Sequence, residues 1–181
     1  MDTSGILVFE TPIGPCGMAW GERGLLAVAL PEPTAVAVRA RLLRRFPEAT
    51  GSEPPAEVIQ AKDLILELLG GASADLSPIQ LDMARVGVFE RRLYELLRTI
   101  PPGQVVSYGE LATRLGEPGG AQAVGQAMGR NPWPIVVPCH RVVGSNGKLG
   151  GFSAPGGVKT KLKILDIEGA LKPETLPLFG G

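Results

Sequence analysis

Two adjacent residues, Cys139 and His140, carry the side chains best suited to chemistry in this chain of 181 residues. His140 is the only histidine, and Cys139 is one of two cysteines. A cysteine attacks as its thiolate, and the ordinary thiol pKa of about 8.5 falls beside a base or a positive dipole. An imidazole can accept the thiol proton near neutral pH, directly or through a water molecule. The pair therefore indicates an activated nucleophile, with a small buried cysteine as the alternative interpretation.

This pair belongs to a series of motifs in a definite order: GQVVSYGELA at 103–112, AVGQAM at 123–128, NP at 131–132 and PCHRV at 138–142. Together they resemble the methylated-DNA–protein-cysteine methyltransferases, or O6-alkylguanine-DNA alkyltransferases, which repair DNA by moving an alkyl group onto one of their own cysteines. The resemblance is strong over residues 89–169 and extends to the N-terminal half only in general style.

The resemblance implies a catalytic role for four side chains. Cys139 would take the alkyl group from O6-alkylguanine, and O4-alkylthymine is left open as a further substrate. His140 would be the base, acting through a bound water, and Glu168 would orient the imidazole. Asn131 would join the recognition helix to the cysteine loop by hydrogen bonds. Because cellular reductants do not reverse a thioether, the enzyme would turn over once.

The same resemblance implies the contacts with the damaged base. An alkylated base inside a duplex cannot reach a buried thiol, so its nucleotide must be rotated out of the stack. Tyr108 would crowd the target phosphate and help to donate a hydrogen bond to the flipped guanine. Val142 would line the pocket for this base together with the following loop, which contains Phe152 and Ser153.

The predicted recognition helix over 121–128 lacks bulky side chains, which lets a helix approach another surface closely. Tight packing against a neighbouring helix is the alternative explanation. By resemblance, this helix would enter the minor groove of double-stranded DNA with its small residues Ala121, Ala123 and Gly125. The minor groove carries little sequence information, which suits repair at any site in a genome.

At Gln122 the chain departs from the family pattern. Relatives usually have an arginine at this position, which fills the space left by the flipped base. Glutamine can hydrogen-bond a base but lacks the charge, reach and stacking plane of a guanidinium group. Arg130 is the nearest alternative cation, although it falls past the predicted helix end. The substitution leaves an altered lesion preference open.

Three other functions compete with the alkyltransferase interpretation. A non-catalytic damage sensor would bind alkylguanine without reacting, but such relatives replace the cysteine, commonly with tryptophan. A thiol hydrolase would use Cys139 and His140, but adjacent positions rarely supply the required geometry. A helix-turn-helix regulator would be expected to carry Arg or Asn on its recognition helix rather than Ala and Gly.

Composition and charge support a DNA-binding second half. The chain is 44% hydrophobic with zero net charge. Residues 1–84 contain six Lys/Arg and eleven Asp/Glu, a balance of −5, whereas residues 85–181 contain twelve and seven, a balance of +5. The positive charge therefore accompanies the motifs, as contact with phosphates would require.

The sequence also predicts several absences. The chain has no apolar run long enough to span a bilayer and no secretory pattern, which favours a cytoplasmic protein, nucleoid-associated if bacterial. Cys16 and Cys139 are not expected to pair in a reducing compartment. The two sulfurs lie far apart in the chain and there is only one imidazole, so no metal site is predicted, and no cofactor is expected. The expected state is a monomer, with cooperative binding on DNA left open.

The hydrophobic patterns divide the chain at residue 84. Residues 1–84 are predicted to form a small α/β domain, ribonuclease-H-like by resemblance, with strands at 6–9, 16–20, 25–30 and 79–83 and helices at 34–46 and 56–69. Residues 85–181 are predicted to form a mainly helical domain of winged helix-turn-helix type, with helices at 89–100, 107–115 and 121–128. Ser107 and Glu110 form a capping box that opens the second of these helices.

Overall fold

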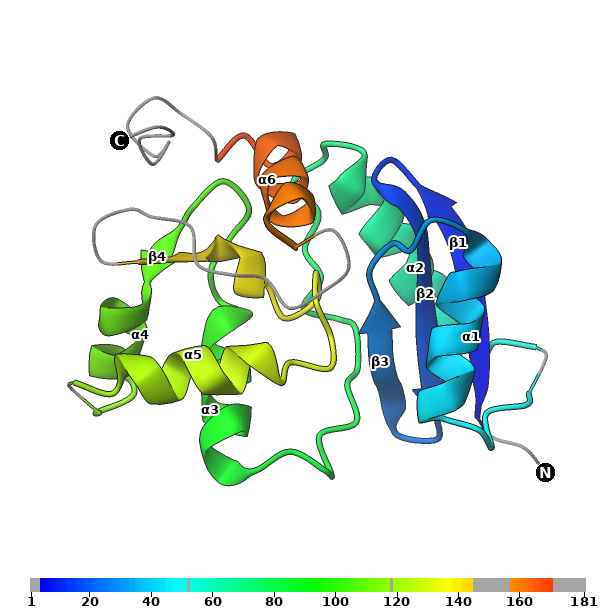
Figure 1. Ribbon diagram of the computed structural model, residues 1–181, viewed down its shortest axis with the longest axis horizontal. Helices are drawn as coiled ribbons and strands as arrows, with labels where there is room; N and C mark the ends of the chain where they lie inside the picture. The colour runs from blue at the N-terminus through cyan, green and yellow to red at the C-terminus, as the bar shows by residue number, and fades with distance from the viewer. Residues whose placement is uncertain (1–3, 52, 118, 145–156, 171–181) are drawn as a thin grey trace. The chain divides into compact units, whose positions relative to one another are not determined.

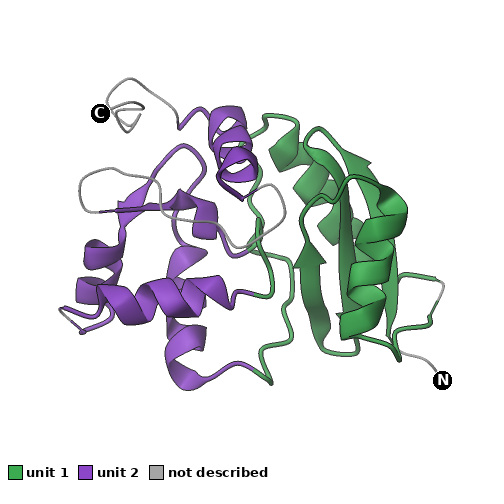
Figure 2. Cartoon of the chain, viewed as in Figure 1, with its two compact units in different colours: residues 1–85, 132–136 green, residues 86–131, 137–181 purple. Residues whose placement is uncertain are grey.

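The residues described by the computed structural model are 4–51, 53–117, 119–144 and 157–170. The chain divides into two units, residues 1–85 with 132–136 and residues 86–131 with 137–181 (Figure 2). Over the described ranges the protein is of the α/β class, with six α-helices and two small sheets. No helix in these ranges is long and apolar enough to cross a membrane.

The first unit is built on an antiparallel sheet with strand order β1-β2-β3 (Figure 1). The strands are β1 (Gly5–Thr11), β2 (Gly14–Gly21) and β3 (Gly24–Ala29), each overlapping a strand predicted from the sequence. Gly24 opens β3 with a φ of 121°, a left-handed conformation that glycine adopts without steric cost. The short turns follow from such residues between apolar runs, as the sequence pattern indicated.

Helix α1 (Ala35–Arg45) packs against β1 and β2 and contributes to the core of this unit. Its N-cap is Thr34, whose Oγ1 accepts a hydrogen bond of 3.1 Å from the Ala37 amide. Val38 and Leu42 face the sheet and are buried. Burying side chains of this size stabilises a fold by about 1.5–3 kcal/mol each. Helix α2 (Ala56–Leu69) has the predicted bounds and ends at Gly70.

The short strand predicted over 79–83 does not form. Leu81 makes only an isolated bridge to Leu25, with hydrogen bonds of 2.9 Å from Leu25 N to Gln80 O and 3.0 Å from Asp82 N to Leu25 O. The alternation of apolar residues was real, since Ile79 is buried, but the paired stretch is too short to be a strand.

The segment 132–136 belongs to the first unit although it stands in the second half of the chain. Val28 N donates to Pro132 O at 2.9 Å, and the buried Trp133 donates through Nε1 to Leu25 O at 2.8 Å. Ile135 is also buried and has a φ of 77°. A β-branched residue in this left-handed region is a steric outlier that persists only where surrounding packing imposes it.

Within its described residues, the second unit contains four α-helices, α3 (Val88–Leu97), α4 (Tyr108–Arg114), α5 (Ala121–Gly129) and α6 (Gly157–Ile167). It also contains a two-stranded parallel sheet, β4 (Val106–Ser107) with β5 (Val142–Val143), and a 3₁₀ helix, η1 (Cys139–Arg141). The sequence predicted α3, α4 and α5 within a few residues of their ends. It did not predict α6, η1 or the small sheet.

Helices α4 and α5 pack against each other (Figure 1). Ser107 caps α4 as predicted, with its Oγ accepting a 3.0 Å hydrogen bond from Glu110 N. Between the two helices, Gly116 and Gly119 have positive φ values of 77° and 86°, which explains the sharp turn. The buried side chains of this pair include Leu111 and Val124.

Candidate active site

His140 and Arg141 share one carboxylate, that of Glu168. The Nε2 atom of His140 lies 2.9 Å from Glu168 Oε2. Arg141 donates to the same carboxylate through Nε at 3.0 Å and Nη2 at 2.6 Å, and through Nη1 to Ile100 O at 2.6 Å. The side chains of His140 and Glu168 are fully buried. Residues 27 or 28 positions apart in the chain therefore form one buried network.

The charge state of this network follows from its burial and its hydrogen bonds. Burial alone would raise the pKa of Glu168, but the hydrogen bonds from His140 and Arg141 outweigh it and lower the pKa to about 2. Burial lowers the pKa of His140 more than Glu168 raises it. At neutral pH the network therefore contains a carboxylate, a guanidinium and a neutral imidazole.

These charge states determine the tautomer of His140. An ionised carboxylate can only accept hydrogen bonds, so Nε2 must carry the imidazole proton and donate it to Glu168. Nδ1 then carries the lone pair. This atom is buried and has no hydrogen-bond partner among the described residues. The imidazole is thus oriented by Glu168 with its basic nitrogen available.

Cys139 is the first residue of η1 and is only 7% exposed. Burial raises the pKa of its thiol, whereas the side chain of Asn131, the charge of Lys161 and nearby backbone amides act in the opposite direction. The sequence suggested a lowered thiol pKa, but burial dominates. The group is therefore a neutral thiol at neutral pH, and forming its thiolate requires a base.

Asn131 links the end of α5 to the segment before the cysteine. Its backbone amide donates to Met128 O at 3.1 Å, at the end of α5. Its side-chain Nδ2 donates to Val137 O at 2.9 Å. Asn131 therefore joins α5 to the segment before Cys139 by hydrogen bonds.

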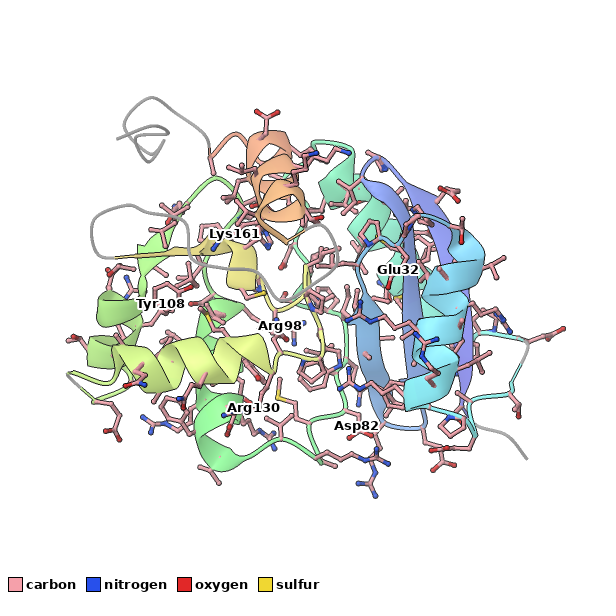
Figure 3. The ribbon with its side chains drawn as sticks, in the orientation of Figure 1. Glu32, Asp82, Arg98, Tyr108, Arg130 and Lys161 are labelled. Carbon is pink, nitrogen blue, oxygen red and sulfur yellow. The ribbon has the colours of Figure 1, made fainter. Side chains whose placement is uncertain are left out.

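Sequence reasoning missed one residue of this cluster, Lys161. Its side chain is buried within α6, and its Nζ donates to Val142 O at 2.8 Å. Figure 3 shows Lys161 beside the strand that carries Val142. The signal that could have found it is helical spacing, because Lys161 lies three and four residues before the buried Ile164 and Leu165.

The exposed face of α5 carries Gln122, Ala123 and Gln126, with Ala121 and Gly125 partly exposed. The opposite face, with Val124 and Ala127, is buried. The inner face of α5 therefore packs on the rest of unit 2, whereas its outer face carries small residues and two glutamines and has no charged side chain.

Tyr108 is the first residue of α4 and is partly buried (Figure 3). Burial and the neighbouring Cys139 raise the pKa of its phenol, which keeps it protonated and able to donate a hydrogen bond. Arg130 is the C-cap of α5, and its Nη2 pairs with Glu90 Oε1 at 2.8 Å. Phe152 and Ser153 lie outside the described residues.

Both cysteines are free and buried. Burial raises the pKa of Cys16 in β2 to about 11, so this thiol offers no thiolate at neutral pH. In the part of the chain that the structure describes, no group of three or more His, Cys, Asp or Glu residues could hold a metal ion.

Comparison with known proteins places the chain among DNA-repair proteins. The family model for the DNA-binding domain of 6-O-methylguanine DNA methyltransferase matches residues 88–170. A methylated-DNA–protein-cysteine methyltransferase of Mycolicibacterium paratuberculosis is 40% identical over 157 residues, covering 86% of this chain and 93% of the relative. The methyltransferase of Methanothermobacter thermautotrophicus is 33% identical over 158 residues, covering 87% and 81%.

Solved structures agree with these relatives. The crystal structure of Mycobacterium tuberculosis O6-methylguanine methyltransferase superposes with a TM-score of 0.74 at 34% identity, covering 94% of this chain and 95% of that one. The structure of the M. tuberculosis protein in complex with DNA superposes with a TM-score of 0.71 at 31% identity, covering 94% and 96%. The chain therefore belongs to the family of methylated-DNA–protein-cysteine methyltransferases.

Proposed function

We propose that this protein repairs DNA by moving an alkyl group from O6 of a guanine to Sγ of Cys139, in a single turnover. Membership of the family makes it a DNA-repair methyltransferase. The observation that supports Cys139 as the acceptor is its position next to a neutral imidazole, which Glu168 orients through Nε2. O4-alkylthymine is proposed as a further substrate.

The proposed reaction moves one alkyl group and one proton. The Cys139 proton passes through a bound water to Nδ1 of His140, and Glu168 offsets the charge of the imidazolium that forms. The thiolate attacks the alkyl carbon in line with the carbon–O6 bond. As the sulfur–carbon bond forms, the carbon–O6 bond breaks, and its electron pair stays on guanine. Guanine takes up one proton and the His140 imidazolium releases one through water, so the proton lost by Cys139 is accounted for and His140 returns to its neutral form.

Asn131 and Tyr108 are proposed to assist from either side of this reaction. The Asn131 amide favours the Cys139 thiolate over the thiol, which lowers the cost of deprotonation in a buried site. The Tyr108 phenol is held in its protonated form and would donate a hydrogen bond to the leaving guanine. Val142 is proposed to line the base pocket, together with Phe152 and Ser153.

The proposed DNA partner is a duplex whose minor groove receives α5 and whose alkylated guanine is flipped out. Support comes from the outer face of α5, where Ala121, Ala123 and Gly125 leave the backbone accessible. Unstacking a nucleotide costs a few kcal/mol, and less for a damaged, poorly paired base. The protein is proposed to bind as a monomer. Its proposed location is cytoplasmic, in association with the nucleoid if the protein is bacterial.

The chain is proposed to fold into two domains. Residues 1–84 would form a ribonuclease-H-like domain around the β1-β2-β3 sheet. Residues 85–181 would form a winged helix-turn-helix domain in which α4 and α5 are the helix pair. The packing of α4 against α5 across a glycine-rich turn supports this proposal.

Replacing Gly125 by Ala should stabilise the protein and weaken its binding to DNA. A Cβ at this position would lie 3.8 Å from Tyr108 Cε1, an ordinary contact, and alanine in a helix is favoured over glycine by about 0.5–1 kcal/mol. In a minor groove, however, the added methyl would separate α5 from the sugars, and we expect at least a several-fold loss of affinity. Thermal unfolding and duplex titration measure the two effects.

Gly109→Ala is the matched control, because a Cβ at this glycine of α4 meets no atom within 4 Å. It should raise stability in the same way and leave the affinity for DNA unchanged. Equal DNA binding by Gly125→Ala and the unmodified protein would show that this face of α5 does not approach DNA.

Replacing Gln122 by Arg should tighten the binding of duplex DNA. The longer, positively charged side chain would reach into the space that the flipped base leaves in the duplex. Gln122 is exposed, so the substitution adds a guanidinium without disturbing the core. The readouts are duplex affinity as a function of salt and the rate of alkyl transfer. Gln126→Arg adds the same charge one helical turn later. This control distinguishes general electrostatic attraction to DNA from insertion of the side chain at position 122 into the duplex.

Both variants should gain affinity through charge, but only Gln122→Arg should also speed the transfer reaction. If it leaves both affinity and rate unchanged, another residue fills the space. Arg130 is then the next candidate, and Glu90→Gln would release it from its 2.8 Å ion pair.

The experiment that tests the proposed function is a stoichiometry measurement. The protein is mixed with excess duplex that contains O6-methylguanine, and the mass of its Cys139 peptide is followed as the lesion disappears. Continued turnover, or loss of the lesion without added mass on Cys139, would contradict the proposal.

A further inference from the structure

Lys161 is a buried cation that the proposed reaction does not use. Its side chain is 1% exposed, and helix α6, which carries it, packs against η1, which begins with Cys139. Among the described residues its ammonium group donates a hydrogen bond to the neutral carbonyl of Val142 at 2.8 Å. Removing an ammonium group from water is unfavourable unless an anion compensates its charge. A neutral carbonyl provides only part of that compensation.

The titratable groups around Cys139 come from each element packed near it. They are Tyr94 of α3, Tyr108 of α4, His140 and Arg141 of η1, Lys161 of α6, and Glu168 after α6. Arg141 and Glu168 pair with each other. His140 is neutral, and so are both tyrosines. Within the described part of the chain, this cluster therefore has a charge of one positive unit while Cys139 is a thiol, and becomes neutral when the thiol proton leaves.

We propose that Lys161 is the buried counter-cation of the Cys139 thiolate. In this role it is a positioning residue, because its charge acts on the nucleophile rather than on the substrate. The inference rests on the proposed function only in naming Cys139 as the acceptor. The positive charge of Lys161 is already present in the buried site, and it allows Cys139 to form a thiolate there.

The directions in which the two pKa values shift agree with this pairing. Burial lowers the pKa of Lys161, and Cys139 raises it again. Conversely, Lys161 lowers the pKa of Cys139 against the larger effect of burial. Because such coupling must be reciprocal, it can be measured either through the pKa of Cys139 or through the pKa of Lys161.

The first measurement is the reactivity of Cys139 toward iodoacetamide as a function of pH, followed by the mass of its peptide. Lys161→Met removes the charge and keeps most of the side-chain volume. Its reactivity profile should shift upward by about one pH unit, with roughly tenfold slower reaction at pH 7 that recovers at higher pH. Lys161→Arg keeps the charge and should shift the profile less. Lys163→Met, an exposed lysine on the same helix, should leave the profile unchanged.

The second measurement does not require Lys161→Met to fold. The ammonium group of Lys161 is titrated by NMR in the unmodified protein and in Cys139→Ala, with its signal assigned through Lys161→Arg. Loss of the sulfur should lower the pKa of Lys161, because the anion that raises it is gone.

Either of two results would overturn the inference. One is a folded Lys161→Met whose Cys139 profile matches that of Lys163→Met. The other is an identical Lys161 titration in the presence and absence of the Cys139 sulfur. Neither readout uses DNA, so the inference can fail while methyl transfer to Cys139 succeeds, and the reverse outcome is equally visible.

Discussion

One equivalent of O6-methylguanine should disappear per protein molecule, and then the reaction should stop. The thioether formed at Cys139 has no leaving group that the site could release, so each molecule can act once. Cys139→Ala should remove no methyl group at all, because its methyl side chain has no nucleophile. The amount of lesion left in the oligonucleotide shows how many methyl groups the DNA has lost, and the mass of the Cys139 peptide shows how many the protein has gained.

Cys16→Ala is the matched control for this experiment. Cys16 is fully buried in β2 and has a pKa of about 11, so it offers no thiolate at neutral pH. The control should still consume one equivalent, with some loss of stability because it removes a buried sulfur. Binding of alkylated DNA by unmodified protein without any added mass would instead identify a damage sensor.

Glu168→Gln should lower the rate of alkyl transfer by about a hundredfold or more and also destabilise the fold. General-base catalysis contributes roughly 10²–10⁴ to a rate, and Glu168 determines which nitrogen of His140 is basic. The same substitution leaves the buried guanidinium of Arg141 without its anion, and breaking a buried pair typically costs about 3–5 kcal/mol. Single-turnover transfer and denaturant unfolding measure the two losses separately.

Acid should destabilise the unmodified protein because it removes the negative charge of Glu168. The pKa of Glu168 is about 2 in the folded state and about 4.3 in an unfolded chain, so the unfolded state binds the proton first as pH falls. The stabilisation is complete above about pH 4.3 and is lost toward pH 2, with roughly 3 kcal/mol at stake. His140 acts in the same direction from about pH 6.5 downward, because its folded pKa is lowered.

Glu95→Gln is the control for Glu168→Gln. Glu95 pairs with Arg91 on the exposed surface of α3, where an ion pair contributes at most about 1 kcal/mol. Its removal should change neither the transfer rate nor the acid dependence by a measurable amount. If Glu168→Gln retained the full transfer rate, His140 would not depend on Glu168 for its orientation.

Much of the local structure was predictable because its causes are local. The apolar spacing and the following glycines predicted α2 with the bounds that it has, and Ser107 opens α4 through its own hydrogen bond to Glu110 N. The strand predicted at 79–83 was wrong because two or three alternating residues cannot form a ladder without a partner along their length. Helix α6 was missed because Lys161 and Thr160 interrupt its apolar face with polar groups that are buried in the fold.

By itself, the sequence determined the family, the adjacent pair of Cys139 and His140, and three of the helices that carry the motifs, since short-range spacing and residue type decide these. Only the tertiary structure decided the charge state of the site. It placed Glu168 between His140 and Arg141, brought Lys161 into the interior and raised the thiol pKa by burial. A pKa depends on water exclusion and on charges far away in the chain, and neither has a signature in local sequence.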